Sequence, residues 1–130
     1  MQFVQFAQAG TMAERVRVLV VDDEAAIRRV LGQFLEGRGC AVREAANGVD
    51  ALAWILSTAL DVVVSDLMMP EMDGLALWRR AAAARPALCR RWVVISAHPL
   101  PQELATAGVL YLQKPADLEA VWAAVRVAVG

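Results

Sequence analysis

Short apolar runs alternate along the chain with longer segments in which apolar residues recur every three or four positions. The runs lie at 18–21, 62–64, 92–95 and 109–112, and a weaker alternating segment lies at 41–45. Short runs rich in valine are typical of strands buried on both faces of a sheet, whereas the weaker segment suits an edge strand. The pattern therefore predicts five strands.

The longer segments predict helices between the strands. In the first of them, apolar side chains follow the spacing of an amphipathic helix that two glycines end: Ile27, Val30, Leu31, Phe34 and Leu35, then Gly37 and Gly39. Further helices are predicted at about 49–57, 75–84 and 117–129. Pro99 and Pro101 leave space for only about two helical turns before Gly108, so the fourth helix is predicted to be short.

Five strand–helix units in succession predict an α/β fold. Right-handed crossovers between parallel strands place helices on both faces of one sheet, which gives a doubly wound, flavodoxin-like domain. The chain reverses direction beside the first strand, so the expected strand order is 2-1-3-4-5, with a ligand crevice between strands one and three. We expect this domain to cover residues 15–130 and residues 1–14 to form an N-terminal extension.

Composition narrows the class of protein. The 130 residues suffice for one domain with a core, and 58% of them are hydrophobic. The formal net charge of -1 favours neither nucleic acid nor an anionic membrane as a direct partner. No apolar run is long enough to span a bilayer, and the start of the chain lacks the basic residues of a signal peptide, so we expect a cytoplasmic protein. Cys40 and Cys89 lack metal-site spacing and are expected to be free thiols.

Polar side chains follow four of the five predicted strands. Asp22 and Asp23 follow the first strand, Asp66 the third, Ser96 the fourth and Lys114 the fifth. Because the strands are parallel, these groups are expected at one edge of the sheet. Three carboxylates in one crevice repel one another unless a cation is bound, and oxygen ligands at an open site favour Mg²⁺, which pairs with phosphate oxygens. A carboxylate can also act as a nucleophile and form an aspartyl phosphate.

Lys114 is the one lysine in a chain with twelve arginines. An ammonium is a compact point charge that can pair with a single carboxylate or phosphoryl oxygen. Phosphoryl transfer to an aspartate needs a fixed cation of this kind, a metal ion on the phosphoryl oxygens and a hydroxyl donor. Lys114, Mg²⁺ and Ser96 would supply these three.

In this order along the chain, the motifs resemble the receiver domain of two-component response regulators. The matching residues lie within about 17–129: Asp22-Asp23, Asp66, Met69-Pro70, Met72-Asp73-Gly74, Ser96-Ala97 and Lys114-Pro115. The chain departs from the family pattern in the 18 positions from Ser96 to Lys114, a few fewer than usual. The loss falls on the fourth helix and on the stretch after Gly108.

The resemblance implies a phosphoacceptor and a metal site. Asp66 would be the phosphoacceptor. Asp23, Asp66 and the main-chain carbonyl of Met68 would bind Mg²⁺, and Asp22 would act on the ion mostly through water.

The resemblance also implies groups that hold the phosphoryl oxygens and respond to them. Ser96 and Lys114 would hold these oxygens, and Tyr111 matches the aromatic residue that changes rotamer in the family. The Lys114-Pro115 peptide matches one that is typically cis in the family. His98, two residues after Ser96, is either a solvated loop residue or a modulator of the phosphoryl site.

The implied function is phosphorylation-dependent signalling. The domain would accept a phosphoryl group from a sensor histidine kinase and relay its state to an output protein by direct contact. It would not be a conventional enzyme, although it would catalyse its own phosphorylation and slow dephosphorylation. A phosphorylation-independent adaptor and a phosphate sink are the alternatives. An aspartate-nucleophile phosphatase of the haloacid dehalogenase type needs D-x-D after strand one, and Asp22-Asp23-Glu24 does not fit.

The last strand and last helix are candidates for a homodimer interface. The helix carries Val121, Trp122, Val125 and Val129 with few charges, and exposed apolar surfaces of this kind tend to be interfaces. The alternative is that the N-terminal extension covers this surface.

Overall fold

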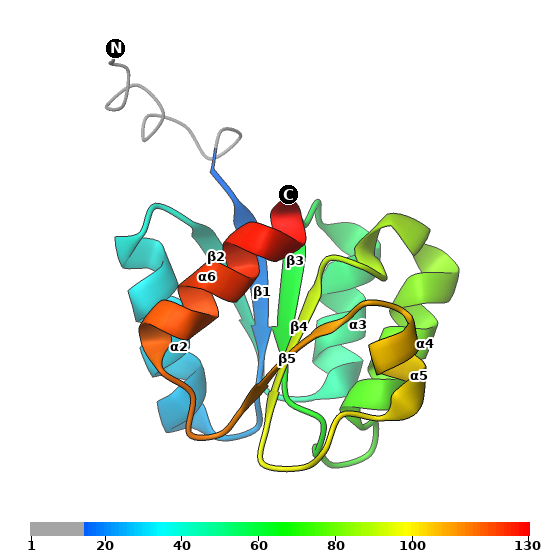
Figure 1. The fold of residues 1–130 in the computed structure, drawn as a ribbon. Coiled ribbons are helices and arrows are strands. Elements are labelled where there is room, and N and C mark those ends of the chain that lie inside the picture. Colours follow the sequence, from blue (N-terminus) through cyan, green and yellow to red (C-terminus); the bar gives the residue numbers. More distant parts are fainter. Residues whose placement is uncertain (1–14) are drawn as a thin grey trace.

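A computed structural model describes residues 15–130 of the protein, so the predicted extension at 1–14 lies outside the described residues. Within this range five strands form a central sheet (Figure 1): β1 Arg17–Val21, β2 Ala41–Ala45, β3 Val62–Ser65, β4 Trp92–Ser96 and β5 Leu110–Gln113. The α-helices of the same range are α2 Ala25–Gly37, α3 Gly48–Ser57, α4 Gly74–Ala84, α5 Gln102–Thr106 and α6 Leu118–Val129. A 3₁₀ turn at Pro86–Leu88 precedes β4.

The sheet is parallel and has the predicted strand order, β2-β1-β3-β4-β5. β2 is an edge strand, as its weak alternation indicated. Val21 at the end of β1 pairs with Ser65 at the end of β3, and Ser96 at the end of β4 pairs with Gln113 at the end of β5. Neighbouring strands therefore end close to one level, and the polar residues that follow them emerge at one edge.

Helices cover both faces of the sheet (Figure 1). Successive strand residues point to opposite faces, so each strand contributes to two cores. On one face Val18, Val20 and Val62 pack with residues of α2 and α6. On the other face Leu19 and Val63 pack with residues of α3, α4 and α5. The valine-rich runs are buried on both faces because both layers need apolar strand residues.

Two expectations about helix faces are wrong. Val30 is 51% exposed, because the buried face of α2 centres on Leu31 and Leu35 and is narrower than the apolar stripe in the sequence. On α6, Val121 and Val125 are fully buried because the helix packs on β3, β4 and β5. These two valines therefore belong to the core, and the last helix lacks the main part of the apolar interface predicted for it.

Helix α5 is short, as predicted, with five residues. Leu104 anchors it in the core, and the Arg79 guanidinium joins it to α4 through Glu103, with Nη2 2.6 Å from Oε1. The thiols of Cys40 and Cys89 are free, as expected. No helix in the described part of the chain is long and apolar enough to cross a membrane.

The amino ends of β1 and β3 are joined by an ion pair. The Arg17 guanidinium donates to both carboxylate oxygens of Asp61, at 2.9 Å and 3.0 Å, and the Arg17 main-chain N–H donates to Oδ2 at 2.8 Å. The Arg17 side chain lowers the pKa of the Asp61 carboxyl, chiefly through this hydrogen bond. One cation and one anion are thus matched here.

Candidate functional site

The sheet register brings the first and third polar strand ends together. Asp22 follows Val21 and Asp66 follows Ser65, and these two strand residues are paired across β1 and β3. The Asp66 main-chain N–H continues the ladder by donating to the Val21 carbonyl at 3.0 Å. The two carboxylates therefore emerge side by side, at the edge where ligands of open α/β sheets bind.

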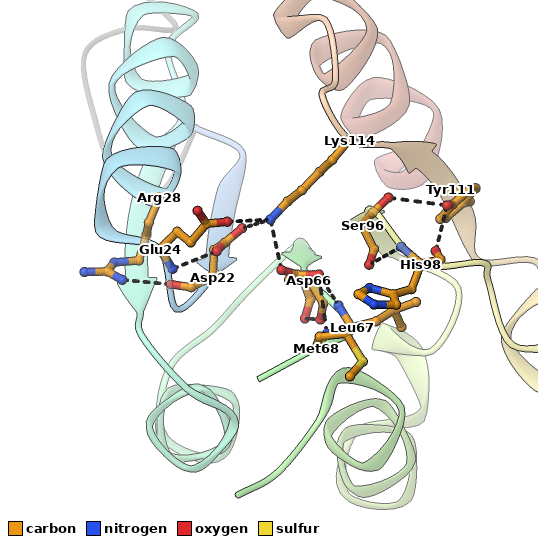
Figure 2. Close-up of polar contacts among 11 residues, drawn as sticks. Asp22, Glu24, Arg28, Asp66, Leu67, Met68, Ser96, His98, Tyr111 and Lys114 are labelled. Carbon is orange, nitrogen blue, oxygen red and sulfur yellow. Dashed lines mark hydrogen bonds and ion pairs between the residues drawn. The ribbon is translucent and has the colours of Figure 1, made fainter. Parts of the chain in front are cut away.

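Lys114 reaches across the sheet edge to both of these carboxylates (Figure 2). Its Nζ lies 2.9 Å from Asp22 Oδ2 and 2.9 Å from Asp66 Oδ2, and 3.5 Å from Glu24 Oε1. The Lys114 main-chain N–H donates to the Ser96 carbonyl at 2.9 Å, which fixes the start of the side chain. The peptide between Lys114 and Pro115 is cis, as the resemblance implied. One ammonium thus bridges residues that are far apart in the sequence.

Asp66 is held firmly by its own loop. It is 7% exposed, and its Oδ1 accepts the Leu67 N–H at 2.6 Å and lies 3.4 Å from the Met68 nitrogen. A Cβ at Gly74, where α4 begins, would lie 2.3 Å from the Asp66 carbonyl oxygen. Glycine is therefore required at position 74, because any side chain would displace the backbone of the loop.

The loop between β3 and α4 also carries backbone strain. Glu71 has a φ of 68°, in the left-handed region that most side chains avoid. The Met72 N–H donates to the Pro70 carbonyl at 2.7 Å across this single residue, which is the hydrogen bond of a γ-turn. Asp73 then caps α4 by accepting the Ala76 N–H at 2.8 Å. The sequence indicated the turn but not this strained position.

Asp22 is the most deeply buried acid of the site. It is 2% exposed, and its Oδ1 accepts the Glu24 N–H at 2.9 Å. Burial raises the pKa of its carboxyl above the usual range, although the Lys114 ammonium and the Glu24 N–H act in the opposite direction. Burial alone would lower the pKa of Lys114, but its hydrogen bonds with Asp22 and Asp66 outweigh this and raise it. Lys114 is therefore charged throughout the physiological pH range.

Three carboxylates of the site can approach one ion. One oxygen from each of Asp22, Asp23 and Asp66 lies within 4.8 Å of the others, and Asp23 is exposed to solvent. Hard oxygen donors with one open side suit Mg²⁺, which keeps several waters and binds through one or two carboxylates. The donor set therefore fits the predicted ion. Met68, whose main-chain carbonyl is also a predicted ligand, is 54% exposed.

Ser96, His98 and Tyr111 lie on the other side of Asp66 from Asp22 (Figure 2). Ser96 is fully buried, and its Oγ accepts the His98 N–H at 3.1 Å. The Tyr111 hydroxyl donates to the His98 carbonyl at 2.7 Å and lies 3.3 Å from the Ser96 carbonyl. The half-buried Tyr111 ring is thus tied through its hydroxyl to the loop that follows Ser96.

Sequence reasoning missed two side chains that contact this site. Glu24 follows Asp22 and Asp23 directly in the sequence, and its carboxylate is the third partner of Lys114. Arg28 lies among the polar residues of α2, yet its Nη1 donates to the Asp22 carbonyl at 2.8 Å. The one local signal is the place of Arg28 in the first turn of α2, because helical side chains lean back toward the loop that precedes the helix.

Comparison with known proteins gives one consistent result. A family model described as the response regulator receiver domain matches residues 18–126. The DNA-binding transcriptional regulator NtrC from Salmonella typhimurium is 37% identical over 120 residues, which cover 89% of this chain and 25% of that protein. The chain spans about a quarter of the length of the first curated relatives that it matches.

Solved structures agree with this result. A CheY-like response regulator receiver domain protein from Methanospirillum hungatei JF-1 has a TM-score of 0.81 and 25% identity, over 88% of this chain and 94% of that chain. A response regulator from Burkholderia pseudomallei, solved with a phosphorylated aspartic acid, calcium ion and citrate, has a TM-score of 0.76 and 28% identity. That match covers 88% of this chain and 68% of that chain.

Proposed function

The chain belongs to the response regulator receiver domain family, and we propose that residues 15–130 accept a phosphoryl group on Asp66 from a sensor histidine kinase. The observation that carries this proposal is the bridge from Lys114 Nζ to the buried Asp66 carboxylate at 2.9 Å, beside two further acids. An ion pair with a purely structural role would need only one acid beside Lys114. Here three acids lie together, so carboxylate oxygens remain to bind a metal ion and to attack a phosphoryl group.

In the proposed reaction an Asp66 carboxylate oxygen attacks the phosphorus of a phosphohistidine. The new P–O bond forms as the P–N bond breaks, and the imidazole takes the electron pair and, later, a proton. Asp23, Asp66 and the Met68 carbonyl would hold Mg²⁺, which when bound neutralises charge on the phosphoryl oxygens. The Lys114 ammonium and the Ser96 hydroxyl lie on either side of Asp66, where they can bind phosphoryl oxygens (Figure 2).

Lys114 has a second part in this scheme. In the free domain its ammonium is shared between Asp22 and Asp66. Phosphorylation removes the negative charge of the Asp66 carboxylate and places charged phosphoryl oxygens beside it, so the ammonium can bind these oxygens while it stays with Asp22. Lys114 thus keeps a partner in both states. We expect Lys114→Arg to impair the reaction, because a planar guanidinium cannot occupy the position of a compact ammonium.

We propose that the phosphorylated state is relayed to an output protein by direct contact. Contact of Ser96 with the phosphoryl group would disturb the His98 loop and its bonds to the Tyr111 hydroxyl. The change would then reach α5, which follows this loop in the chain, and β5, which carries Tyr111. Such a switch is a two-state equilibrium that the phosphoryl contacts shift. His98 enters this scheme as a modulator through its main chain.

The first test is phosphate uptake on a defined residue. The protein is incubated with acetyl phosphate and Mg²⁺, and intact mass spectrometry counts the phosphoryl groups added. Wild type should gain one group that is labile to base and hydroxylamine, whereas Asp66→Asn should gain none. Asp61→Asn is the matched control, because it makes the same change in an acid at the opposite edge. Phosphate on Ser96 or His98 would contradict the mechanism.

The second test separates a signalling switch from a phosphate sink. Hydrogen exchange is measured with and without a beryllofluoride mimic of the phosphoryl group. A switch predicts changed protection from Leu104 to Leu112, whereas a sink predicts changes only in the loops of Asp22, Asp66 and Ser96. A protein that takes up phosphate but shows the second pattern would be a sink. A protein that takes up none would favour the adaptor.

A further inference from the structure

The Arg28 side chain contacts the main chain of the acidic loop rather than any of its carboxylates. It rises from the first turn of α2 and is nearly covered, with 16% of the side chain exposed. Nη1 donates to the Asp22 carbonyl at 2.8 Å (Figure 2), and Nε donates to Glu44 Oε1 at 3.2 Å. The guanidinium therefore links the first turn of α2, the acidic loop and the edge strand β2.

Glu44 holds the guanidinium from the other side. Its carboxylate lies over Gly32, one turn after Arg28 on the same face of α2, where a Cβ would come within 2.9 Å of Oε2. The absence of a side chain at position 32 leaves the space in which Glu44 meets Arg28. The neighbouring residue of β2 also contacts the loop, because the Ala45 carbonyl accepts the Asp22 N–H at 3.2 Å.

We propose that Arg28 is a positioning residue for the Mg²⁺ site and that Glu44 acts through it. The inference rests on the proposed function, since it concerns the same ion. The Asp22 carbonyl belongs to the peptide that leads into Asp23, the exposed acid of the three that can approach the ion. By binding this carbonyl, Arg28 fixes the orientation of the peptide and so the direction in which the Asp23 side chain leaves the backbone.

Electrostatic repulsion and loop positioning predict opposite changes in Mg²⁺ affinity when Arg28 is removed. Arg28 is a positive charge close to a cation site, so Coulomb repulsion alone predicts that its removal strengthens Mg²⁺ binding. If Arg28 orients the loop, its removal weakens Mg²⁺ binding despite the gain in electrostatics. Loss of a residue that orients a metal ligand typically reduces metal affinity by about tenfold or more. The sign of the change therefore identifies the role.

The experiment is an Mg²⁺ titration of the full chain, followed by tryptophan fluorescence or amide shifts, without any phosphodonor. We expect Arg28→Gln to raise the Kd for Mg²⁺ about tenfold and Arg28→Lys to raise it nearly as much, because lysine keeps the charge but not the fork. Glu44→Gln should raise the Kd by about threefold, and the double variant should bind no more weakly than Arg28→Gln alone.

Arg29→Gln is the matched control for charge. Arg29 is the exposed neighbour on the same helix, so its loss should leave the Kd unchanged or slightly lower. Gly32→Ala controls for stability. The substitution should stabilise α2, because alanine is a better helix former than glycine. It should also displace the Glu44 carboxylate and thereby raise the Kd for Mg²⁺ by about twofold. It also serves as the test if Arg28→Gln does not fold.

A second readout examines the loop without metal. The Glu24 N–H, which donates to Asp22 Oδ1, should exchange its hydrogen faster in Arg28→Gln than in Arg29→Gln. If wild type binds Mg²⁺ and Arg28→Gln binds it equally well or more tightly, the inference about Arg28 is overturned while the proposed metal site stands. If wild type binds no Mg²⁺, the proposed metal site fails, and the exchange of Glu24 still reports whether Arg28 orders the loop.

Discussion

Two clusters of charge lie at opposite ends of the neighbouring strands β1 and β3. At the amino ends, Arg17 and Asp61 match one cation with one anion, and the Asp61 carboxylate accepts three hydrogen bonds, all of them from Arg17. At the carboxyl ends, the Lys114 ammonium contacts three carboxylates, those of Asp22, Glu24 and Asp66. Asp22 and Asp66 are almost fully buried. The first arrangement is complete by itself, whereas the second has unsatisfied negative charge.

This difference separates a structural pair from a functional site. A matched pair adds a little stability and has no net charge with which to attract further ions. Buried acids in excess of their cations disfavour the folded state unless protons or metal ions bind, so they are retained for a reason other than stability. The same two strands thus carry both kinds of cluster, and charge balance distinguishes them better than residue type does.

The largest effect is expected from Lys114→Met, which keeps the aliphatic stem and removes the charge. Two buried carboxylates would lose their cation, so we expect the free energy of unfolding to fall by about 3 kcal/mol in EDTA. Urea denaturation measures this. Mg²⁺ should restore part of the loss. A variant as stable as wild type in EDTA would mean that the buried carboxylates do not depend on this cation, and the contrast between the two clusters would disappear.

The next effect is stabilisation by Mg²⁺ itself. At ten times its Kd, Mg²⁺ should add about 1.4 kcal/mol to the free energy of unfolding, because it binds the folded state alone. Asp23→Asn should remove this gain, whereas Asp61→Asn should keep it in full. Urea denaturation with and without the ion gives both values. Equal stabilisation of the two variants would show that Mg²⁺ binding is nonspecific.

The amino-end pair should show a smaller effect with its own pH dependence. Asp61→Asn should lower the free energy of unfolding at pH 7 by about 1 kcal/mol, because the pair is partly exposed to solvent. Arg17 lowers the folded-state pKa of Asp61, so the stabilisation is present above the unfolded-state value of about 3.9 and is lost as the pH falls through the folded-state value. The difference between Asp61→Asn and wild type should therefore shrink below about pH 4. A constant difference would indicate lost packing instead.

The smallest effect is expected from relief of the backbone strain at Glu71, in the loop that follows Asp66. Glu71→Gly should raise the free energy of unfolding by about 0.5 kcal/mol, since glycine relieves the positive φ but increases the entropy of the unfolded chain. Glu71→Ala is the control, because it removes the carboxylate and keeps the strain. If alanine stabilises as much as glycine, charge repulsion and not backbone strain explains the gain.

Most of the fold follows from local patterns. The valine runs predict the strands, because a parallel sheet is buried on both faces. The alternation of strands and helices predicts the strand order, because crossovers are right-handed. Helix α5 is short because two prolines and Gly108 confine it. The exposure of Val30 and the burial of Val121 and Val125 were not predictable, because helical periodicity gives the width of an apolar face but not what covers it.

The site was predictable at the level of residues and less so at the level of contacts. Parallel strands guarantee that Asp22, Asp66 and Lys114 meet at one edge, so their bridge could be expected. The link from Arg28 to Glu44 joins a helix to an edge strand through side chains 16 residues apart, and no local pattern encodes it. It depends on Gly32, whose missing Cβ matters only once Glu44 is placed above it.

The bridge through Lys114 also sets an order of events during synthesis. Lys114 follows Asp66 by 48 residues and Asp22 by 92. A ribosome that adds 5–20 residues per second needs about 2–10 s to travel from Asp66 to Lys114. During this interval the two acids exist without the ammonium that neutralises them, so the carboxyl edge cannot close as it does in the finished domain. The nascent chain therefore has the proposed phosphoacceptor several seconds before it has the ammonium, and the proposed phosphorylation becomes possible only when the fifth strand joins the sheet.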